Sequence, residues 1–204
     1  HYSFSPHSCY ISSITFMDRL LQLFQPRTKS LSLLLLTLIM LLGLALRLYR
    51  LDASPAGALV DEMHFGFIAH SLNLTGADEH GVTWPLVFRG FGDYKLPMYA
   101  YLLVPIVRWF GLSVLSIRLP SVLFGSLLIG AMYFFARSMR LSKTASLVVT
   151  LITALSPWSF FLSRFGLESN IGLFFWVMGL TTLQLTKDQQ ARWRQAVPGF
   201  LLAL

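Results

Sequence analysis

Two adjacent carboxylates, Asp61 and Glu62, are the residues of this sequence best suited to chemistry. They lie in the stretch Leu59-Val-Asp-Glu-Met-His-Phe-Gly66, shortly after a long apolar run. Acidic side chains are costly next to lipid, so a pair retained there usually has a partner or a function. A carboxylate can accept the proton of an attacking hydroxyl. The pair therefore indicates proton chemistry at a membrane surface, although acids in a first helical turn also stabilise the helix dipole.

The composition is that of an integral membrane protein. Of the 204 residues, 55% are hydrophobic and only 12% are charged, whereas a soluble domain has about 25% charged residues. The mean hydropathy is +0.63 and the net charge is +7. Basic residues that flank membrane spans explain this charge, so nucleic acid is not an expected partner. The single cysteine, Cys9, excludes an internal disulfide.

Long apolar runs predict the membrane spans, because about 20 apolar residues cross a bilayer. The predicted spans are 31–49, 117–136, 145–162 and 171–185, with the start of a fifth at 197–204. Residues 96–110 are apolar but short and contain Pro105, which favours an interfacial segment. Residues 1–30 are expected to form a cytoplasmic tail, in which residues 1–16 precede Met17 and are either a non-native extension or an unstructured tail.

Basic clusters determine the predicted topology. If 96–110 does not span, the clusters around Arg27, Arg137–Lys143 and Lys187–Arg194 all lie on the cytoplasmic side, as the positive-inside rule favours. Every acid except Asp18 and Asp188 then faces outside, in the loop 50–115 or the turn 163–170. Within the first loop, residues 62–74 have the apolar spacing of an amphipathic helix that Gly76 would end, and an irregular loop is expected to follow.

The two external segments bring together a candidate site. It comprises Asp61, Glu62, Lys95, Arg164 and Glu168, with His64 and His80 nearby. Lysine or arginine can neutralise a leaving phosphate while a carboxylate takes a proton, which suits a polyprenyl-phosphate sugar at the lipid surface. The same residues also have ordinary interpretations: interfacial histidines, a membrane anchor at Lys95, and a local ion pair between Arg164 and Glu168. No regular ligand spacing predicts a zinc site, and no cofactor is expected.

Several short motifs, in order, resemble a known family. They are Asp61-Glu-Met-His-Phe-Gly66, Gly92-Asp-Tyr-Lys-Leu-Pro97, Phe110-Gly-Leu-Ser113 with Arg118, and Ser156-Pro-Trp158 with Ser163-Arg164 and Glu168. This set, over residues 31–186, is similar to the dolichyl-phosphate-mannose protein mannosyltransferases and the related lipid A aminoarabinose transferases, which have the membrane-embedded GT-C fold.

The resemblance implies a role for each matching residue. Asp61 would be the catalytic base, and Glu62 would support it or bind the acceptor. Lys95 and Arg164 would hold the donor phosphate, and Glu168 stands where the family often has an aspartate. The His-Pro-Pro element of the mannosyltransferases proper is missing after Lys95, which favours a bacterial-type member and leaves the acceptor open. The family's larger number of spans implies that residues 31–204 are an N-terminal portion of the GT-C domain, truncated in the fifth span.

The sequence thus predicts an all-α, polytopic transmembrane bundle of the GT-C type, with amphipathic juxtamembrane helices in the first external loop. The expected function is inverting transfer of a sugar from a polyprenyl-phosphate donor to a hydroxyl of a protein or glycolipid. The expected location is the bacterial plasma membrane, with the active site on its external face. The alternatives are a transporter, which should carry carboxylates in the middle of its spans, and a non-catalytic assembly subunit.

Overall fold

The computed structural model describes residues 29–90 and 92–186 of the chain. These residues form seven helices and one two-stranded hairpin, so the predicted all-α class is confirmed. Residues 1–28 of the predicted tail 1–30 lie outside the described residues, and its last two residues begin the first helix. The basic cluster Lys187–Arg194 and the start of a fifth span at 197–204 also lie outside the described residues.

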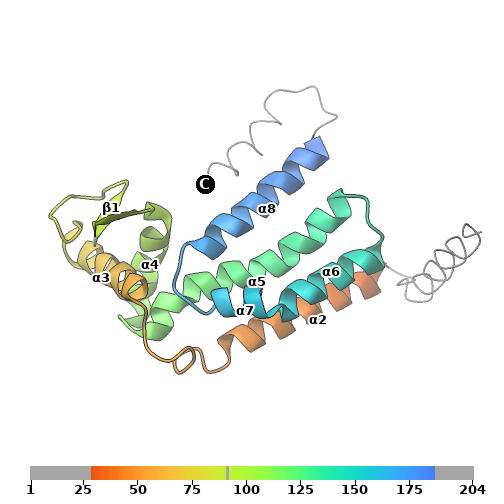
Figure 1. Cartoon of the computed structure of the whole chain (residues 1–204), viewed down its shortest axis with the longest axis horizontal. Helices are drawn as coiled ribbons and strands as arrows, with labels where there is room; N and C mark the ends of the chain where they lie inside the picture. The colour runs from red at the N-terminus through yellow and green to blue at the C-terminus, as the bar shows by residue number, and fades with distance from the viewer. Residues whose placement is uncertain (1–28, 91, 187–204) are drawn as a thin grey trace, which may run out of the picture.

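Four helices run side by side as a bundle: α2 (Lys29–Leu48), α5 (Val114–Ser138), α6 (Lys143–Leu155) and α8 (Ser169–Thr186) (Figure 1). Among the described helices, α2 and α5 are long and apolar enough to cross a membrane. Only 22% of the α2 span is buried against the other described residues, so these residues leave most of its apolar surface uncovered. Serine side chains begin two of the helices: Ser113 accepts a hydrogen bond from the Ser116 amide, and Ser142 accepts one from the Ala145 amide.

The third predicted span, 145–162, is not one helix. The chain ends α6 at Leu155 and starts a short helix, α7 (Pro157–Leu162), after Ser156. Proline lacks an amide hydrogen and its ring clashes with the preceding turn, so Pro157 begins a new helix instead of extending the old one. The break leaves carbonyl groups at the end of α6 that other side chains must satisfy.

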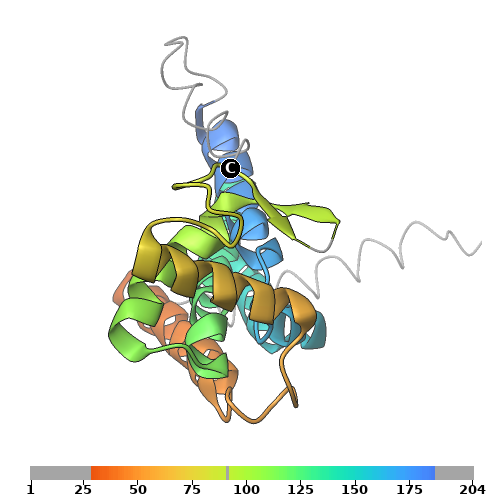
Figure 2. The ribbon, with the colours of Figure 1, turned by 90° about the vertical axis from the view of Figure 1, so that its left-hand side faces the viewer.

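A separate layer lies across one end of the bundle (Figures 1 and 2). It contains α3 (Val60–Thr75) and α4 (Pro97–Phe110), which correspond to the predicted helix 62–74 and the segment 96–110. Gly76 ends α3 in the left-handed conformation, with φ at 72°. The layer has its own apolar core, which joins α3 and α4 to β1 and the first turns of α5 and α8. Its members include Phe65, Phe88, Tyr99, Leu103 and Ile117.

The segment expected to be an irregular loop contains a hairpin. Strand β1 (Phe88–Gly90) pairs antiparallel with β2 (Asp93–Lys95), with Phe88 opposite Lys95. Gly92 has φ at 79°, a conformation that costs a glycine little. Strands of three residues are too short to show the alternation by which a strand is recognised in a sequence.

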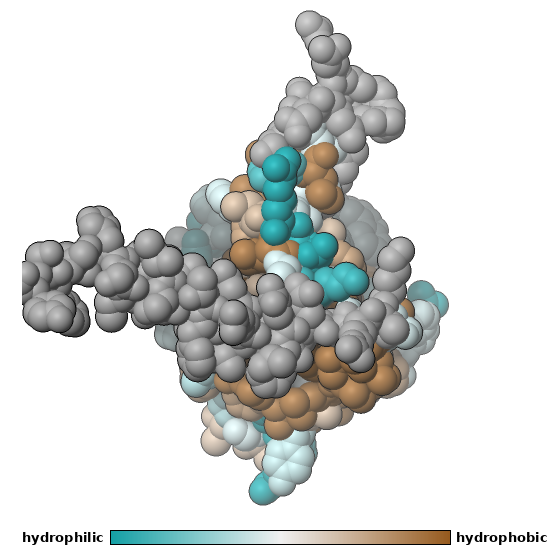
Figure 3. Space-filling model, turned by 90° about the vertical axis from the view of Figure 1, so that its right-hand side faces the viewer, coloured by the Kyte–Doolittle hydropathy of each residue, from teal (hydrophilic) through white to brown (hydrophobic). Residues whose placement is uncertain are grey.

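The acidic and basic connections lie at opposite ends of α5. The 49–59 loop, the α3–α4 layer and the turn 163–168 are at the end where α5 starts, while the turn from Arg137 to Lys143 follows its other end (Figure 1). Seen from that other end, the surface combines hydrophilic side chains with hydrophobic areas (Figure 3). The separation of these two groups at opposite ends of α5 is expected if the Arg137–Lys143 turn and the α3–α4 layer face opposite sides of a bilayer.

Candidate active site

Asp61 and Lys95 form an ion pair at the bundle end. Asp61 lies in the first turn of α3 and Lys95 ends β2, and the Lys95 Nζ is 2.8 Å from Asp61 Oδ1. The Asp61 side chain is 47% exposed and the Lys95 side chain 11% exposed. A second carboxylate, Asp93, lies 3.3 Å from the same Nζ. A lysine ammonium has three donors, so one remains after these two contacts. The pair therefore combines an accessible carboxylate with a cation that could contact a ligand.

The neighbouring carboxylates stabilise the charged form of Lys95. The pKa of Lys95 is raised, chiefly because Lys95 donates a hydrogen bond to Asp61. Partial burial lowers this pKa, and the contact with Asp93 raises it further. The pKa of Asp93 is lowered by the hydrogen bond from the Tyr94 amide and then by Lys95. Lys95 thus remains a cation through the neutral range, as neutralisation of a phosphate requires.

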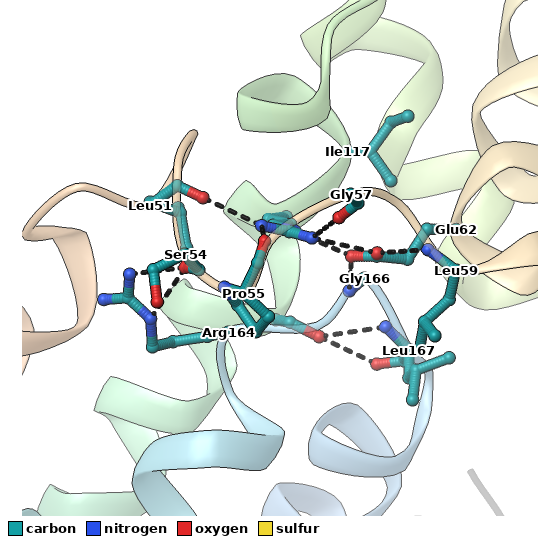
Figure 4. Close-up of polar contacts among 12 residues, drawn as sticks. Leu51, Ser54, Pro55, Gly57, Leu59, Glu62, Ile117, Arg164, Gly166 and Leu167 are labelled. Atoms are coloured by element: carbon teal, nitrogen blue, oxygen red, sulfur yellow. Dashed lines mark hydrogen bonds and ion pairs between the residues drawn. The ribbon is translucent and has the colours of Figure 1, made fainter.

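Glu62 is completely buried, unlike its neighbour in the sequence. Its two oxygens accept four hydrogen bonds: Oε1 from Arg118 Nε at 2.8 Å and the Gly166 amide at 2.7 Å, and Oε2 from the Leu59 amide at 2.9 Å and Arg118 Nη2 at 3.2 Å (Figure 4). Burial raises the pKa of Glu62, but the hydrogen bonds from Arg118, Leu59 and Gly166 outweigh it, so the net shift is downward. A carboxylate enclosed in this way has no free face for an acceptor. Of the two roles that the resemblance implies for Glu62, these contacts suit support of Asp61 better than contact with the acceptor.

Arg118, which is not among the candidate site residues, is the ion-pair partner of Glu62 and joins it to the 49–59 loop. Besides Glu62, its guanidinium donates to the carbonyls of Leu51, Pro55 and Gly57 at 2.6–3.0 Å. All five of its N–H groups are thereby used, and its side chain is fully buried. A cation in the apolar stretch Ile117-Arg-Leu-Pro120 signals a buried partner. The sequence does not say which of the acids that partner is.

Arg164 is also fully engaged, but only by backbone carbonyls. It donates to the carbonyls of Leu46, Arg47, Arg50 and Ser54, with Ser54 accepting two of the five bonds. Its guanidinium therefore satisfies the end of α2, where carbonyls have no helical partner. The predicted contact with a donor phosphate would require Arg164 to give up these bonds. We accordingly assign Arg164 to the support of the 49–59 loop.

The two predicted histidines hold the loop between α3 and the hairpin. His64 is buried, and its Nε2 is 2.9 Å from Glu79 Oε1. His80 Nε2 is 2.9 Å from the Arg89 carbonyl on β1 and 3.5 Å from the same Glu79 oxygen. Gly90 packs directly on the His64 ring, where a Cβ atom would overlap it. These contacts fix the hairpin that carries Lys95, so the histidines position the site.

Glu168 precedes α8, and its side chain is partly exposed. It makes no ion pair with any cation in residues 29–90 and 92–186. Across the same residues, no cluster of three or more histidine, cysteine, aspartate or glutamate side chains is suited to a metal.

A helical bundle with apolar spans, and a layer across one end that carries the Asp61–Lys95 pair, is the architecture of a helical membrane protein. The family model of dolichyl-phosphate-mannose-protein mannosyltransferase matches residues 37–204, most of the chain, and the chain belongs to that family. The fold is therefore the helical membrane architecture of the GT-C glycosyltransferases, and the activity that the family indicates is glycosyl transfer at a membrane. Searches among curated proteins and among solved structures found no match.

Proposed function

We propose that this protein transfers a sugar from a polyprenyl-phosphate donor to an acceptor hydroxyl, with Asp61 as the base and Lys95 as the contact for the donor phosphate. The observation that carries the proposal is the pair itself. A half-exposed carboxylate lies 2.8 Å from a lysine at the end of an apolar bundle, in a chain of the mannosyltransferase family.

The reaction is a single displacement at the anomeric carbon. The acceptor oxygen attacks that carbon as Asp61 takes the hydroxyl proton, and the bond from the carbon to the phosphate oxygen breaks. The departing phosphate keeps the bonding electron pair and is stabilised by Lys95. Attack opposite the leaving group inverts the anomeric centre. An arriving phosphate also competes with Asp61 and Asp93 for the Lys95 ammonium, which would release Asp61 to act on the acceptor.

Glu62, Arg118 and Arg164 are positioning residues in this proposal. Glu62 fixes the start of α3 through the Leu59 amide and Arg118, and therefore fixes the adjacent Asp61. Arg118 and Arg164 hold the 49–59 loop that leads into α3. Glu168, whose carboxylate is not engaged by any described cation, is the remaining candidate for contact with the acceptor.

The location of the carboxylates favours a transferase over a transporter. In the described residues, all seven acids lie outside α2, α5, α6 and α8, in α3, in β2 or in the loops. An ion path would instead place carboxylates within the bundle helices. We propose that the Asp61 end faces the external side of a bacterial plasma membrane, because the Arg137–Lys143 turn lies at the other end and basic loops are retained in the cytoplasm.

The test is donor dependence in the full-length protein, using lipid-phosphate mannose as the first donor. Lys95→Gln should raise the KM for the donor on the order of tenfold or more, as loss of a charge-assisted contact predicts. Arg89→Gln is the matched control, because Arg89 is an exposed cation on the same hairpin without an ion pair to a described acid. Equal donor KM values for Lys95→Gln, Arg89→Gln and the native protein would remove Lys95 from the donor site.

A further inference from the structure

Three arginines converge where α2 ends. Arg47 lies in its last turn, Arg50 follows the helix, and Arg164 donates to the carbonyls of both Arg47 and Arg50. Arg47 is fully buried, and its guanidinium donates to the carbonyls of Gly43 and Ala154 and to the Ser159 hydroxyl. The Ala154 carbonyl is one of those freed at the end of α6 by the break before Pro157.

None of the three arginines forms an ion pair with an acid in the described part of the chain. The side chains that lie within 4.0 Å of a carboxylate are Lys95, Arg118, His64 and His80. None of the three arginines at the end of α2 has such a neighbour. Excess positive charge at the end of a membrane span favours an anionic ligand at that place.

A hollow of about 400 Å³ opens beside the cluster. Its walls are Tyr49, Arg50, Ala53, Ser54, Phe160 and Arg164. Arg164 has no donor left for a ligand, so it contributes charge, whereas the exposed Arg50 side chain makes no hydrogen bond or ion pair with any described residue. Arg50 has φ at 49°, which is uncommon for a residue with a side chain. Three bonds to its carbonyl, from Ala53, Ser54 and Arg164, hold this conformation.

We infer that this hollow binds the phosphate of an anionic bilayer phospholipid. Arg50 would contact the phosphate within the field of Arg47 and Arg164. Tyr49 and Phe160 supply aromatic surface of the kind found at the membrane interface. The acyl chains would lie along α2, whose apolar surface is largely uncovered by the other described residues. This ligand is separate from the sugar donor at Lys95, and the inference does not depend on the proposed function.

The experiment measures lipid retention by the purified full-length protein with native mass spectrometry. Phosphatidylglycerol and phosphatidylcholine with identical acyl chains are added separately, so that only the head group differs. The native protein should retain phosphatidylglycerol preferentially. Arg50→Gln should weaken this binding about fivefold, the factor expected from one arginine near an anionic lipid surface. Arg108→Gln, which removes an exposed arginine from the end of α4, should bind like the native protein.

Competition identifies the source of the phosphate. Inorganic phosphate and polyprenyl phosphate, each added at the concentration of the phospholipid, should fail to displace phosphatidylglycerol. Displacement by inorganic phosphate would overturn the assignment to a lipid. Displacement by polyprenyl phosphate would show that the hollow binds the donor lipid, and would overturn its assignment to a separate phospholipid. Equal retention of the two phospholipids by the native protein would also overturn it. The comparison of the two phospholipids on the native protein tests the proposal even if Arg50→Gln does not fold. Arg50→Lys is a second variant, which keeps the positive charge and should retain phosphatidylglycerol.

Discussion

Replacement of Glu62 by glutamine should destabilise the protein far more than the corresponding change at Asp61. Glu62 has two carboxylate oxygens that accept four hydrogen bonds, whereas a glutamine has one oxygen and an amide group that would face donors. The variant also leaves Arg118 as an uncompensated buried charge. Removal of one partner of a buried ion pair costs about 3–5 kcal/mol. Asp61→Asn breaks a half-exposed pair, for which about 0.2–1 kcal/mol is typical.

The assay is thermal unfolding of the full-length protein in one detergent, with each variant compared at the same pH. Glu62→Gln should lower Tm on the order of 10 °C, and Asp61→Asn should leave it nearly unchanged. In a double-mutant cycle, Arg118→Gln combined with Glu62→Gln should recover part of the loss, because no buried charge is then left unpaired.

The stability of the protein should also depend on pH through Glu62. The pKa of Glu62 is lower in the folded protein than its ordinary value of 4.5. Its contribution to stability is therefore present above that value and is lost as the pH falls through the folded pKa. Native protein should lose stability in this acidic range more steeply than Glu62→Gln. A Glu62→Gln variant with native Tm, together with a destabilised Asp61→Asn, would refute the assignment of the two neighbouring acids.

Three further measurements probe the hairpin and the topology. Gly90→Val places side-chain atoms where the His64 ring lies, so it should displace the hairpin and raise the donor KM, as measured in the transfer assay. The pKa of Lys95 is raised above its ordinary value of 10.5, so its ion pairs stabilise the fold below pH 10.5 and are lost as the pH rises through the folded pKa. The native protein should therefore lose stability with rising alkaline pH more steeply than Lys95→Gln does. In a full-length background free of native cysteines, Asp93→Cys and Leu141→Cys should react with an impermeant maleimide from opposite sides of sealed vesicles, since both positions are exposed and lie at opposite ends of α5. Labelling of both from one side would contradict the proposed topology.

Much of the helical framework follows from local signals in the sequence. Apolar runs locate α2, α5 and α8 to within a few residues, and Gly76 ends α3 as its conformational freedom predicts. Hydropathy alone joins α6 and α7 into one predicted span, because apolar residues continue on both sides of Pro157. The hairpin from Phe88 to Lys95 gives no signal in the sequence, because its strands are too short to show a period.

The internal organisation of the site could not be read in the same way. Glu62 and Arg118 are separated by 56 positions, and Arg164 and Arg50 by 114, so their contacts depend on how the helices pack. Asp61 and Glu62 are equivalent by composition and neighbours by position. Helix geometry turns one toward Lys95 and the other toward Arg118, and only this difference in surroundings separates a candidate base from a structural anion.

The most direct test of the account is a single-turnover transfer reaction with Asp61→Asn in the full-length protein, preloaded with lipid-phosphate sugar. The asparagine retains the shape of Asp61 but cannot accept the proton of the acceptor hydroxyl. Donor binding should remain measurable, Tm should stay near the native value, and transfer should fall by about 10²-fold or more. Transfer at the native rate by a folded, donor-bound Asp61→Asn protein would contradict the assignment of Asp61 as the base.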